Sequence, residues 1–578
     1  SRLTPSLFTS TMKKFLILLF FTLSSCRNLK KPLVEYNFCT DSNGSPYVFK
    51  RSSANEQCEN DVAKIQYINA INSTGWASVD IEISSEDIPE WEQAYAAGFL
   101  EGRSTRHLIY DHAYNLLHNY CKGTREYCDR AFDFLLRQFE FMRLSIENNQ
   151  RDPYWRQVNF TLTHLVGMVD GYDNTLMQSR NDEELVKHKV FLIQLQAEIW
   201  DIEAKFNRPK WMSRRRGHCS ALVKLLSDRS DILFAHTTWD SLSSLLRVQK
   251  RLRFKLSHLP GAEYSYSGYP GTLASIDDFY MSGSNLAITE TTNELYTTKL
   301  YDRMKSTSVP TWIRSQISTR MASTGEEWAI IFGKHNSGTY NNQWIIVDYN
   351  KFDSGLIKLL PGTLTIIEQM PGALEYADMT SHLEKNSFWS SYNRPFVNIL
   401  IPPNFSILFR FFPQMFSLGG FSDMEKKYGE YFSYNETARS KIFRREQDKV
   451  VDFRSLHSLM RLNNYLSDPL SQCSSCSPHE NAEYAIASRN DLNPRDGKYP
   501  FKGMEVRDMA ATDVKYTSSS LPPLSFISEC GPTHETLPPF DWNESDLNEI
   551  VRHRGQPQRW NFHPIHNMWT DNSLYESD

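Results

Sequence analysis

The spacing of hydrophobic and polar residues divides the chain into a helical part and a later part rich in strands. Apolar residues recur at steps of three and four over residues 88–117, 126–146 and 185–206, as they do along one face of an amphipathic helix. We therefore predict that residues 28–216 are mostly helical. Small residues, among them Gly98 and the glycines of the stretch 167–172, punctuate this part and indicate turns or close helix contacts.

Alternating polar and apolar residues replace the helical spacing from Cys219 onward, just after the basic run 214–216. Residues 220–226 and 232–239 predict two strands that pair across a polar turn. Residues 242–254 predict a helix packed on this hairpin. The composition and the architecture are thus predicted to change together near residue 216.

A second pair of strands is predicted further along the chain. Residues 328–332 form an apolar run, and residues 337–349 contain a polar turn with a glycine followed by a second apolar stretch. Such runs, separated by a turn of this composition, are typical of paired strands.

The first predicted hairpin places Cys219 close to His236. If Leu226 pairs with Asp231, then Cys219 lies opposite Thr238. Because side chains alternate along a strand, Cys219, Thr238 and His236 then share one face, with diagonal neighbours roughly 7 Å apart. A shift of the register by one residue would move them to opposite faces.

Cys219 is the candidate nucleophile of the chain. Its thiol can attack an acyl carbon, and its α-amine can act as the base once the preceding peptide bond is cut. The alternative is a buried cysteine that opens an ordinary strand, since free cysteine mostly behaves as a small hydrophobic residue. For His236 the alternative is a hydrogen-bonded structural histidine.

The composition indicates a globular protein and gives no sign of nucleic-acid binding. The chain has 578 residues, of which 40% are hydrophobic and 13% aromatic, and this inventory suits a large packed core. The net charge is −5, and no long basic face stands out. We therefore expect no nucleic-acid partner.

The beginning of the sequence predicts entry into the secretory pathway. Two lysines precede the apolar stretch 15–23, which is too short to span a bilayer and resembles the core of a signal peptide. We assign residues 12–26 to this signal and exclude residues 1–11, which precede Met12, as upstream or non-native. A bacterial lipoprotein signal at residues 23–26 is the alternative. The mature chain is expected to have no transmembrane segment and to be secreted or lysosomal.

Acceptor motifs and cysteines fit this route. N-glycosylation motifs occur at Asn43, Asn72, Asn159, Asn404, Asn435 and Asn543. The spacings of Cys121–Cys128 and Cys473–Cys476 predict local disulfides in an oxidising compartment. A zinc or redox site is the alternative at residues 473–476, but no second ligand pair follows at the required spacing. The pairing of Cys39, Cys58 and Cys530 stays open.

Several runs spread over the mature chain resemble one family, the phospholipase B-like proteins, which are lysosomal or secreted glycoproteins and include the lamina ancestor protein. The similar runs include QAYAAGFLEG at Gln93, GHCSALVKLL at Gly217, SGTYNNQWIIVDYNKF at Ser337 and ARSKIFRREQ at Ala438. The resemblance implies an α+β fold, the αββα four-layer sandwich of N-terminal-nucleophile hydrolases. It also implies self-cleavage between His218 and Cys219, which gives a mostly helical fragment 27–218 and a fragment 219–578 with the nucleophile and most of the sheets.

The same resemblance implies roles for pocket residues beside Cys219. His236 and Trp239 would lie next to the nucleophile, the second as a wall of the pocket. Asn393 would donate a hydrogen bond to an oxyanion. The remaining two implied positions are Thr292 and Arg444, whose neighbours Thr291 and Arg445 fit the runs equally well.

The function implied is hydrolysis of acyl ester or amide bonds, with phospholipids as the expected substrates. The alternatives are an amidohydrolase of N-acyl amides, and a self-processing glycoprotein without lipid turnover. The sequence has neither a Gly-x-Ser-x-Gly elbow nor a His-Glu-x-x-His zinc motif, and we expect no cofactor or metal. The two fragments are expected to remain associated, with a lipid or N-acyl substrate as the partner.

Overall fold

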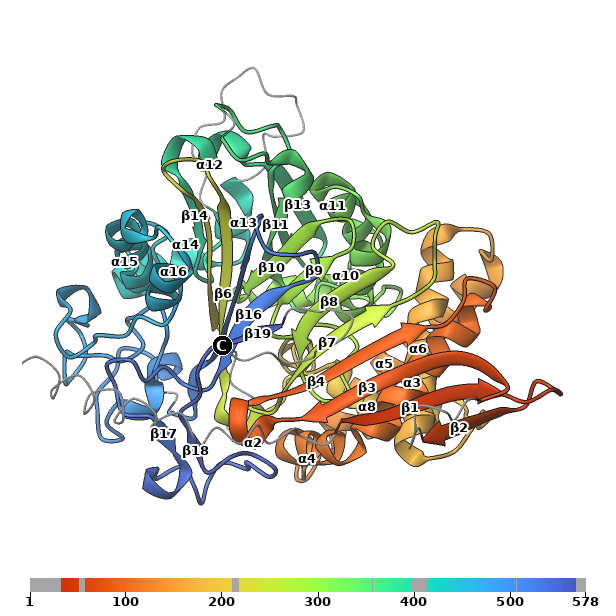
Figure 1. Cartoon of the computed structure of the whole chain (residues 1–578). Helices are drawn as coiled ribbons and strands as arrows, with labels where there is room; N and C mark the ends of the chain where they lie inside the picture. Colours follow the sequence, from red (N-terminus) through yellow and green to blue (C-terminus); the bar gives the residue numbers. More distant parts are fainter. Residues whose placement is uncertain are drawn as a thin grey trace, which may run out of the picture. The chain divides into compact units, whose positions relative to one another are not determined.

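Two large sheets organise the protein (Figure 1). A computed structural model describes residues 33–50, 58–209, 218–355, 357–396, 413–505 and 507–567. The larger sheet has eleven strands: β1 (Val34–Thr40), β2 (Pro46–Lys50), β3 (Asn60–Asn69), β4 (Trp76–Ile83), β7 (Arg247–Arg253), β8 (Glu263–Gly268), β9 (Phe279–Ser282), β10 (Leu286–Thr292), β11 (Asn342–Asp348), β12 (Leu364–Met370) and β13 (Ala373–Asp378). The smaller has six: β5 (His218–Leu225), β6 (Ile232–Ser241), β14 (Phe388–Ser391), β15 (Met509–Ser518), β16 (Phe526–Cys530) and β19 (Ile565–Asn567).

The order of the strands brings distant segments together. The larger sheet runs β13-β12-β11-β10-β9-β8-β7-β4-β3-β1-β2, and the smaller runs β14-β5-β6-β15-β16-β19. Neighbouring strands are antiparallel, except that β4 and β7 are parallel. A short third sheet pairs β17 (Phe540–Asp541) with β18 (Arg559–Trp560). Together with the helices, this architecture confirms the predicted α+β class.

The helices precede, interrupt and follow the sheets. Those before residue 218 are α2 (Ile71–Thr74), α3 (Glu90–Ser104), α4 (Arg106–Leu117), α5 (Arg125–Asn148), α6 (Pro153–Asp173), α7 (Asp182–Lys187), α8 (Lys189–Gln194) and α9 (Ile199–Lys205). Those after it are α10 (Thr311–Met321), α11 (Gly325–Gly333), α12 (Thr380–Asn386), α13 (Pro413–Leu418), α14 (Phe421–Tyr428), α15 (Ala438–Glu446) and α16 (Phe453–Met460).

Three of the hydrophobic cores among the described residues show how the two sheets are layered. The larger sheet shares one core with α3 and α11, to which Ile346 contributes. The adjacent Ile345 contributes to a second core, which also contains Val223 of the smaller sheet. On its other face the smaller sheet packs Leu222 against Phe443 of α15, and α15 and α16 lie on the outer side of β6 and β14 in Figure 1. Successive residues of β5 and β11 therefore point into different cores, as the alternation of a strand requires.

The helical prediction is confirmed over the three periodic stretches, but the part before residue 218 also contributes four strands, β1–β4. The burial of β3 alternates only in part, because one face packs on α3 and the neighbouring strands cover its edges. A strand with such a short and mixed pattern of buried and exposed residues cannot be distinguished from a helix by periodicity alone.

The hairpin of β5 and β6 is confirmed, whereas two neighbouring assignments are wrong. Residues 242–254 form a short 3₁₀ turn and the strand β7 instead of a helix, because basic residues of β7 pair with distant buried acids such as Asp80 and Glu101. Residues 328–332 belong to the helix α11. There the Thr324 side chain caps the first turn by accepting from the Glu327 backbone N–H, a signal that the apolar run obscured.

Glycines allow α3 and α6 to pack backbone against backbone. Gly98 lies against the His164 carbonyl and Gly171 lies against the Phe99 carbonyl, so closely that a Cβ atom at either glycine would overlap the carbonyl oxygen. These positions confirm the close helix contacts that the small residues predicted. The contact also joins α6 to the helix that covers the larger sheet.

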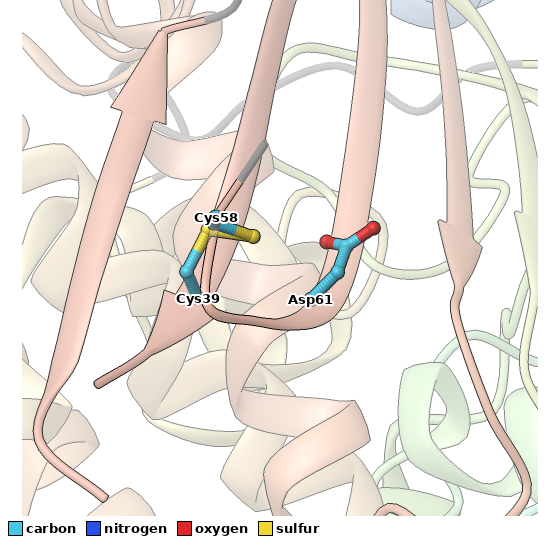
Figure 2. Close-up of side chains that lie close together, drawn as sticks. All are labelled: Cys39, Cys58 and Asp61. Carbon is cyan, nitrogen blue, oxygen red and sulfur yellow. A yellow bond between two sulfur atoms is a disulfide. The ribbon is translucent and has the colours of Figure 1, made fainter. Parts of the chain in front are cut away.

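The cysteines form three disulfides among the described residues. The predicted pairs Cys121–Cys128 and Cys473–Cys476 are present, and Cys39 pairs with Cys58 beside Asp61 (Figure 2). Two cysteines, Cys219 and Cys530, are free and buried.

The remaining sequence motifs lie mostly on the surface or outside the described residues. Five glycosylation acceptors are exposed, as an attached glycan requires: Asn43, Asn72, Asn159, Asn435 and Asn543. The predicted signal peptide, the basic run 214–216 and Asn404 lie outside the described residues. None of the described helices is long and apolar enough to cross a membrane.

We expect Gly98→Ala and Gly171→Ala to lower the free energy of unfolding by about 1–3 kcal/mol each, because the added methyl group forces α3 and α6 apart. Urea unfolding of each variant measures this loss. The control is Gly333→Ala at the end of α11, where a Cβ atom would lie 3.6 Å from Leu374, an ordinary contact. Equal stability of Gly98→Ala and Gly333→Ala would contradict the close-packing account.

Candidate active site

Cys219 is the second residue of β5 and lies opposite Thr238 of β6. The Leu226 amide donates to the Asp231 carbonyl at 3.1 Å, which closes the turn in the predicted register. Cys219 and His236 therefore project from the same face of the smaller sheet. That face carries the core between the two sheets, so both side chains point toward the larger sheet.

The larger sheet places two acidic residues against this pair. Asp278 precedes β9, and one of its carboxylate oxygens lies within 4.8 Å of both the Cys219 sulfur and a ring nitrogen of His236. Glu290 of β10 lies next to Asp278 and interacts with its side chain. All four residues are 3% exposed or less. The Tyr340 hydroxyl donates to Asp278 at 2.5 Å.

Burial and these acids set the protonation of the cluster. Burial, with a smaller contribution from the acidic side chains of Glu290 and Asp278, raises the pKa of the Cys219 thiol well above its usual value. Burial and the nearby Lys515 ammonium hold the pKa of His236 well below 6.5, so the imidazole is neutral. Burial also raises the pKa of Asp278, and it raises that of Glu290 to about 7. The uncleaved chain therefore holds a neutral thiol beside a neutral base.

A buried ionic network supports the strand that carries Thr238. Asp513 of β15 accepts from Lys515 at 2.6 Å and from Arg247 at 2.8 Å, and these contacts hold its pKa at about 2. Lys515 also donates to the Thr238 hydroxyl at 2.6 Å and to the Asp277 carbonyl at 2.8 Å. The network thus fixes β6, β15 and the loop before β9 relative to one another.

Asn393 and Arg439 hold the backbone of Cys219. The Cys219 amide nitrogen donates to the Asn393 side-chain oxygen at 3.0 Å, and the Asn393 side-chain nitrogen donates to the Thr292 carbonyl at 2.7 Å. The Arg439 guanidinium donates to the same Asn393 oxygen at 2.8 Å and to the Cys219 carbonyl at 2.6 Å. In this arrangement the side-chain oxygen of Asn393 positions the backbone nitrogen of Cys219, while the side-chain NH₂ group of Asn393 faces the Thr292 carbonyl.

Most of the residues predicted for the site lie near Cys219. Trp239 is buried on the opposite face of β6, where its ring packs against Arg439 at 4.4 Å and lies beside His218. Thr292 contributes its carbonyl oxygen, and the hydroxyl of Thr291 lies 3.4 Å from the Asn393 backbone nitrogen. Both threonines of the ambiguous pair therefore contact Asn393.

Arg444 does not contact Cys219 or the residues around it. It is exposed and donates to the Ser440 hydroxyl and the Asn435 carbonyl. Its alternative, Arg445, pairs with Asp468. The arginine that contacts Cys219 is Arg439, from the same run of sequence. Five residues along a helix turn the side chain to another face, so Arg439 and Arg444 project from different sides of α15.

Sequence reasoning also missed Asp278 and Glu290. They come from the larger sheet, 59 and 71 residues after Cys219, and no local pattern connects them to the hairpin. Two consecutive acids at residues 277–278, before a strand that is otherwise apolar, are the signal that could have indicated a buried polar site.

A polar cavity reaches the same end of β6. Asp240, on the face of His236 and Thr238, lines a cavity of about 900 Å³ together with Gln196, Trp200, Arg208 and Arg507. Asp240 is two residues beyond Thr238, a distance of roughly 7 Å along a strand. Cys219, His236 and Asp278 are not among the residues that line the cavity, and its walls come from both sides of residue 218.

The fold and this site define an α+β protein with a buried, cysteine-centred polar cluster at the start of a strand. The family model for phospholipase B matches residues 63–567. The chain belongs to the phospholipase B-like family.

Named relatives cover nearly the whole chain. It is 41% identical to "Putative phospholipase B-like 1" of Caenorhabditis elegans over 92% of each chain. It is 39% identical to human "Putative phospholipase B-like 2" over 88% of this chain and 86% of the relative. For "Phospholipase B-like protein B" of Dictyostelium discoideum the identity is 36%, over 87% and 84%.

We expect Glu290→Gln to change how stability depends on pH. The folded-state pKa of Glu290 is raised from 4.5 to about 7, so between these values the folded protein holds a proton that the unfolded chain has lost. Its contribution to stability is therefore lost as the pH rises toward 7. Relative to wild type, the variant should gain about 3 kcal/mol between pH 5 and pH 8.

Urea unfolding at the two pH values measures this difference. The control is Glu86→Gln, which removes an exposed carboxylate and should follow wild type at both pH values. An identical pH dependence for Glu290→Gln and Glu86→Gln would show that Glu290 is charged in the folded protein.

Proposed function

We propose that the protein is a secreted or lysosomal hydrolase of acyl ester or amide bonds that deacylates phospholipids through an N-terminal cysteine exposed by self-cleavage. The observation that carries this proposal is the position of Cys219. Its thiol faces a neutral histidine within 4.8 Å, and its nitrogen is held at 3.0 Å by Asn393. One residue thus presents a nucleophile and a future amine in a fixed arrangement.

The order of the cores supports a sandwich of the N-terminal-nucleophile type. Helices α3 and α11 share a core with the larger sheet, the two sheets share the next, and the smaller sheet shares the third with α15 and α16. We infer that this order is an αββα sandwich with β5 as the strand that begins at the nucleophile.

The proposed maturation starts from the neutral thiol. His236 accepts the thiol proton as the Cys219 sulfur attacks the His218 carbonyl carbon. The bond between that carbon and the Cys219 nitrogen then breaks, the nitrogen takes up a proton, and a thioester remains. Water hydrolyses the thioester, which leaves a carboxylate on His218 and a free thiol and amine on Cys219.

After cleavage the α-amine of Cys219 becomes the base. An α-amine has a pKa near 7.7–8.0 in reference peptides, and burial together with a nearby positive charge lowers it. The buried Arg439 supplies that charge, since it contacts both the Cys219 carbonyl and Asn393. The amine is therefore favoured in its neutral form, which can take the thiol proton when a substrate is attacked.

The fragments are expected to remain associated because one sheet contains strands of both. β4 of fragment 27–218 pairs with β7 of fragment 219–578. Across this seam Asp80 pairs with Arg251, and Glu101 pairs with Lys250 at 2.7 Å, in buried ion pairs. Separating the fragments would leave these charges unpaired, at a cost of several kcal/mol.

The substrate is proposed to enter through the 900 Å³ cavity beside Asp240. Its arginines Arg208 and Arg507 are paired with Glu203 and Asp546, and Trp200 offers an apolar surface. The names of the relatives favour phospholipids as substrates. The alternatives are an amidohydrolase of N-acyl amides and a glycoprotein that only processes itself. Release of fatty acid from radiolabelled phospholipids and N-acyl amides by mature protein separates the three.

We expect Cys219→Ala to remain a single chain and to release no fatty acid, because the nucleophile is absent. Cys219→Ser should cleave slowly and lose most turnover, since a hydroxyl ionises far less readily than a thiol. N-terminal sequencing of the larger fragment checks the site of cleavage. A fragment that begins upstream of Cys219, or cleavage at the same bond in Cys219→Ala, would indicate another protease acting near the basic run.

We expect Arg439→Met to slow cleavage before Cys219, because Asn393 and the Cys219 carbonyl lose the donor that positions them. Loss of one positioning group of this kind typically costs ~10²-fold or more in rate. The fraction of cleaved chain on a gel over time measures it. The matched control is Arg444→Met on the same helix, because the exposed Arg444 side chain binds Ser440 and the Asn435 carbonyl. This variant should mature at the wild-type rate. Equal rates for the two variants would remove Arg439 from the mechanism.

A further inference from the structure

Three groups of cysteine, histidine and acidic residues in the described part of the chain have ligand atoms within 4.8 Å of one another. The first consists of Cys39, Cys58 and Asp61. Its two sulfurs are joined in a disulfide, with the Asp61 carboxylate to one side (Figure 2). A metal ion binds the thiolate form of cysteine, so this group offers a single carboxylate and no site.

The second group, His457, Glu529 and Glu535, already surrounds a positive charge. Arg461 contacts Glu529 at 2.7 Å and Glu535 at 2.9 Å, and His457 contacts Glu529 at 2.8 Å. The guanidinium is fully buried. A metal ion would have to displace this arginine, so the cluster is an ion-pair network.

The third group, Cys219, His236 and Asp278, differs because Cys219 is free and the three ligand atoms face one another within 4.8 Å. Nε2 of His236 has no hydrogen-bond partner among the described residues, whereas the side chains of Asp278 and Glu290 bind each other. The exposed fractions of His236 and Asp278 are 1% or less. Buried polar atoms are rarely left without a partner, so the His236 nitrogen beside a free thiol and a carboxyl group indicates a site for a cation.

We propose that Cys219, His236 and Asp278 bind one Zn²⁺ ion. Thiolate, imidazole and carboxylate are the ligands of tetrahedral zinc, with bonds of about 2.0–2.3 Å. Such bonds place neighbouring ligand atoms about 3.3–3.8 Å apart, so a group within 4.8 Å closes around the ion by about 1 Å. The Thr238 hydroxyl, 3.4 Å from Nδ1 of His236, orients the ring as an outer partner.

Binding exchanges protons for the metal. The Cys219 thiol releases its proton to solvent as the sulfur–zinc bond forms, and the Asp278 carboxyl group releases its own. The charge of the ion replaces those protons in a region where two acids lie next to each other. Zinc held in this way occupies the lone pair with which Cys219 would attack a carbonyl carbon. The site is thus a reversible block on any reaction of Cys219, and the metal binding itself does not depend on the proposed hydrolase activity.

Cobalt is the probe for this site, because Co²⁺ takes the same tetrahedral ligands and shows a thiolate-to-metal charge-transfer absorption. The full chain, freed of metal with a chelator, is incubated with Co²⁺ until the spectrum is constant. We expect one Co²⁺ per chain, a charge-transfer band, and loss of the band when Zn²⁺ is added. Cys219→Ser should lose the band and Asp278→Asn should lose stoichiometric binding, whereas Thr238→Val should weaken binding ~10–100-fold.

Two control variants test the other candidates. Cys530→Ser removes the second free cysteine, and His457→Gln disrupts the network around Arg461. Both should keep the band and the stoichiometry. Thermal unfolding confirms that each variant is folded. Cys219→Ser replaces only the sulfur atom by oxygen, so we expect this variant to keep the fold.

A band that persists in Cys219→Ser, or that disappears in Cys530→Ser, would overturn the assignment, as would a folded wild-type chain that binds no Co²⁺. The readout uses neither a substrate nor the cleavage reaction. An inactive protein that binds cobalt through Cys219 would therefore contradict the proposed function alone, and an active protein without the band would contradict the zinc site alone.

Discussion

The register between β5 and β6 is the constraint on which the candidate site depends. With Cys219 opposite Thr238, the thiol and His236 share the face that looks toward the larger sheet, while Trp239 and the contacts of Arg439 lie on the other. A shift by one residue would turn Cys219 toward α15 and would separate it from Asp278 and Glu290. The core between the sheets resists such a shift, because the same register buries Val223 and Phe234 together.

The second structural requirement is the pairing of charges inside the protein. Lys515, Arg247 and Asp513 are fully buried and satisfy one another directly behind Thr238. A few ångströms away, Asp278 and Glu290 have no comparable cation and keep their protons instead, since an unpaired buried charge is far more costly than a neutral acid. This difference gives neighbouring acids opposite states, with the pKa of Asp513 at about 2 and that of Glu290 at about 7. Both the proposed proton transfers and the proposed zinc site depend on this difference in protonation between neighbouring acids.

Errors in the sequence predictions share one physical cause. The spacing of residues 242–254 predicts a helix, whereas in β7 Arg251 and Lys250 are buried against acids of β4 and α3. The family-like run implies Arg444 as a pocket residue, whereas the side chain that contacts Cys219 is that of Arg439 on the same helix. In each case the missing information is a partner that is distant in the sequence, which no local period contains.

The sequence by itself determined the family, the main helices before residue 206, two of the disulfides and the hairpin that brings Cys219 beside His236. These features follow from local spacing, from turn composition or from runs shared with relatives, so they need no knowledge of the other sheet. Only the tertiary structure decided that Asp278 and Glu290 complete the cluster, that Asn393 and Arg439 hold the backbone of Cys219, and that β4 and β7 join the two predicted fragments in one sheet. These contacts connect residues 59 to 220 positions apart, and they form because packing two sheets face to face leaves room inside only for polar groups that find a partner or stay neutral.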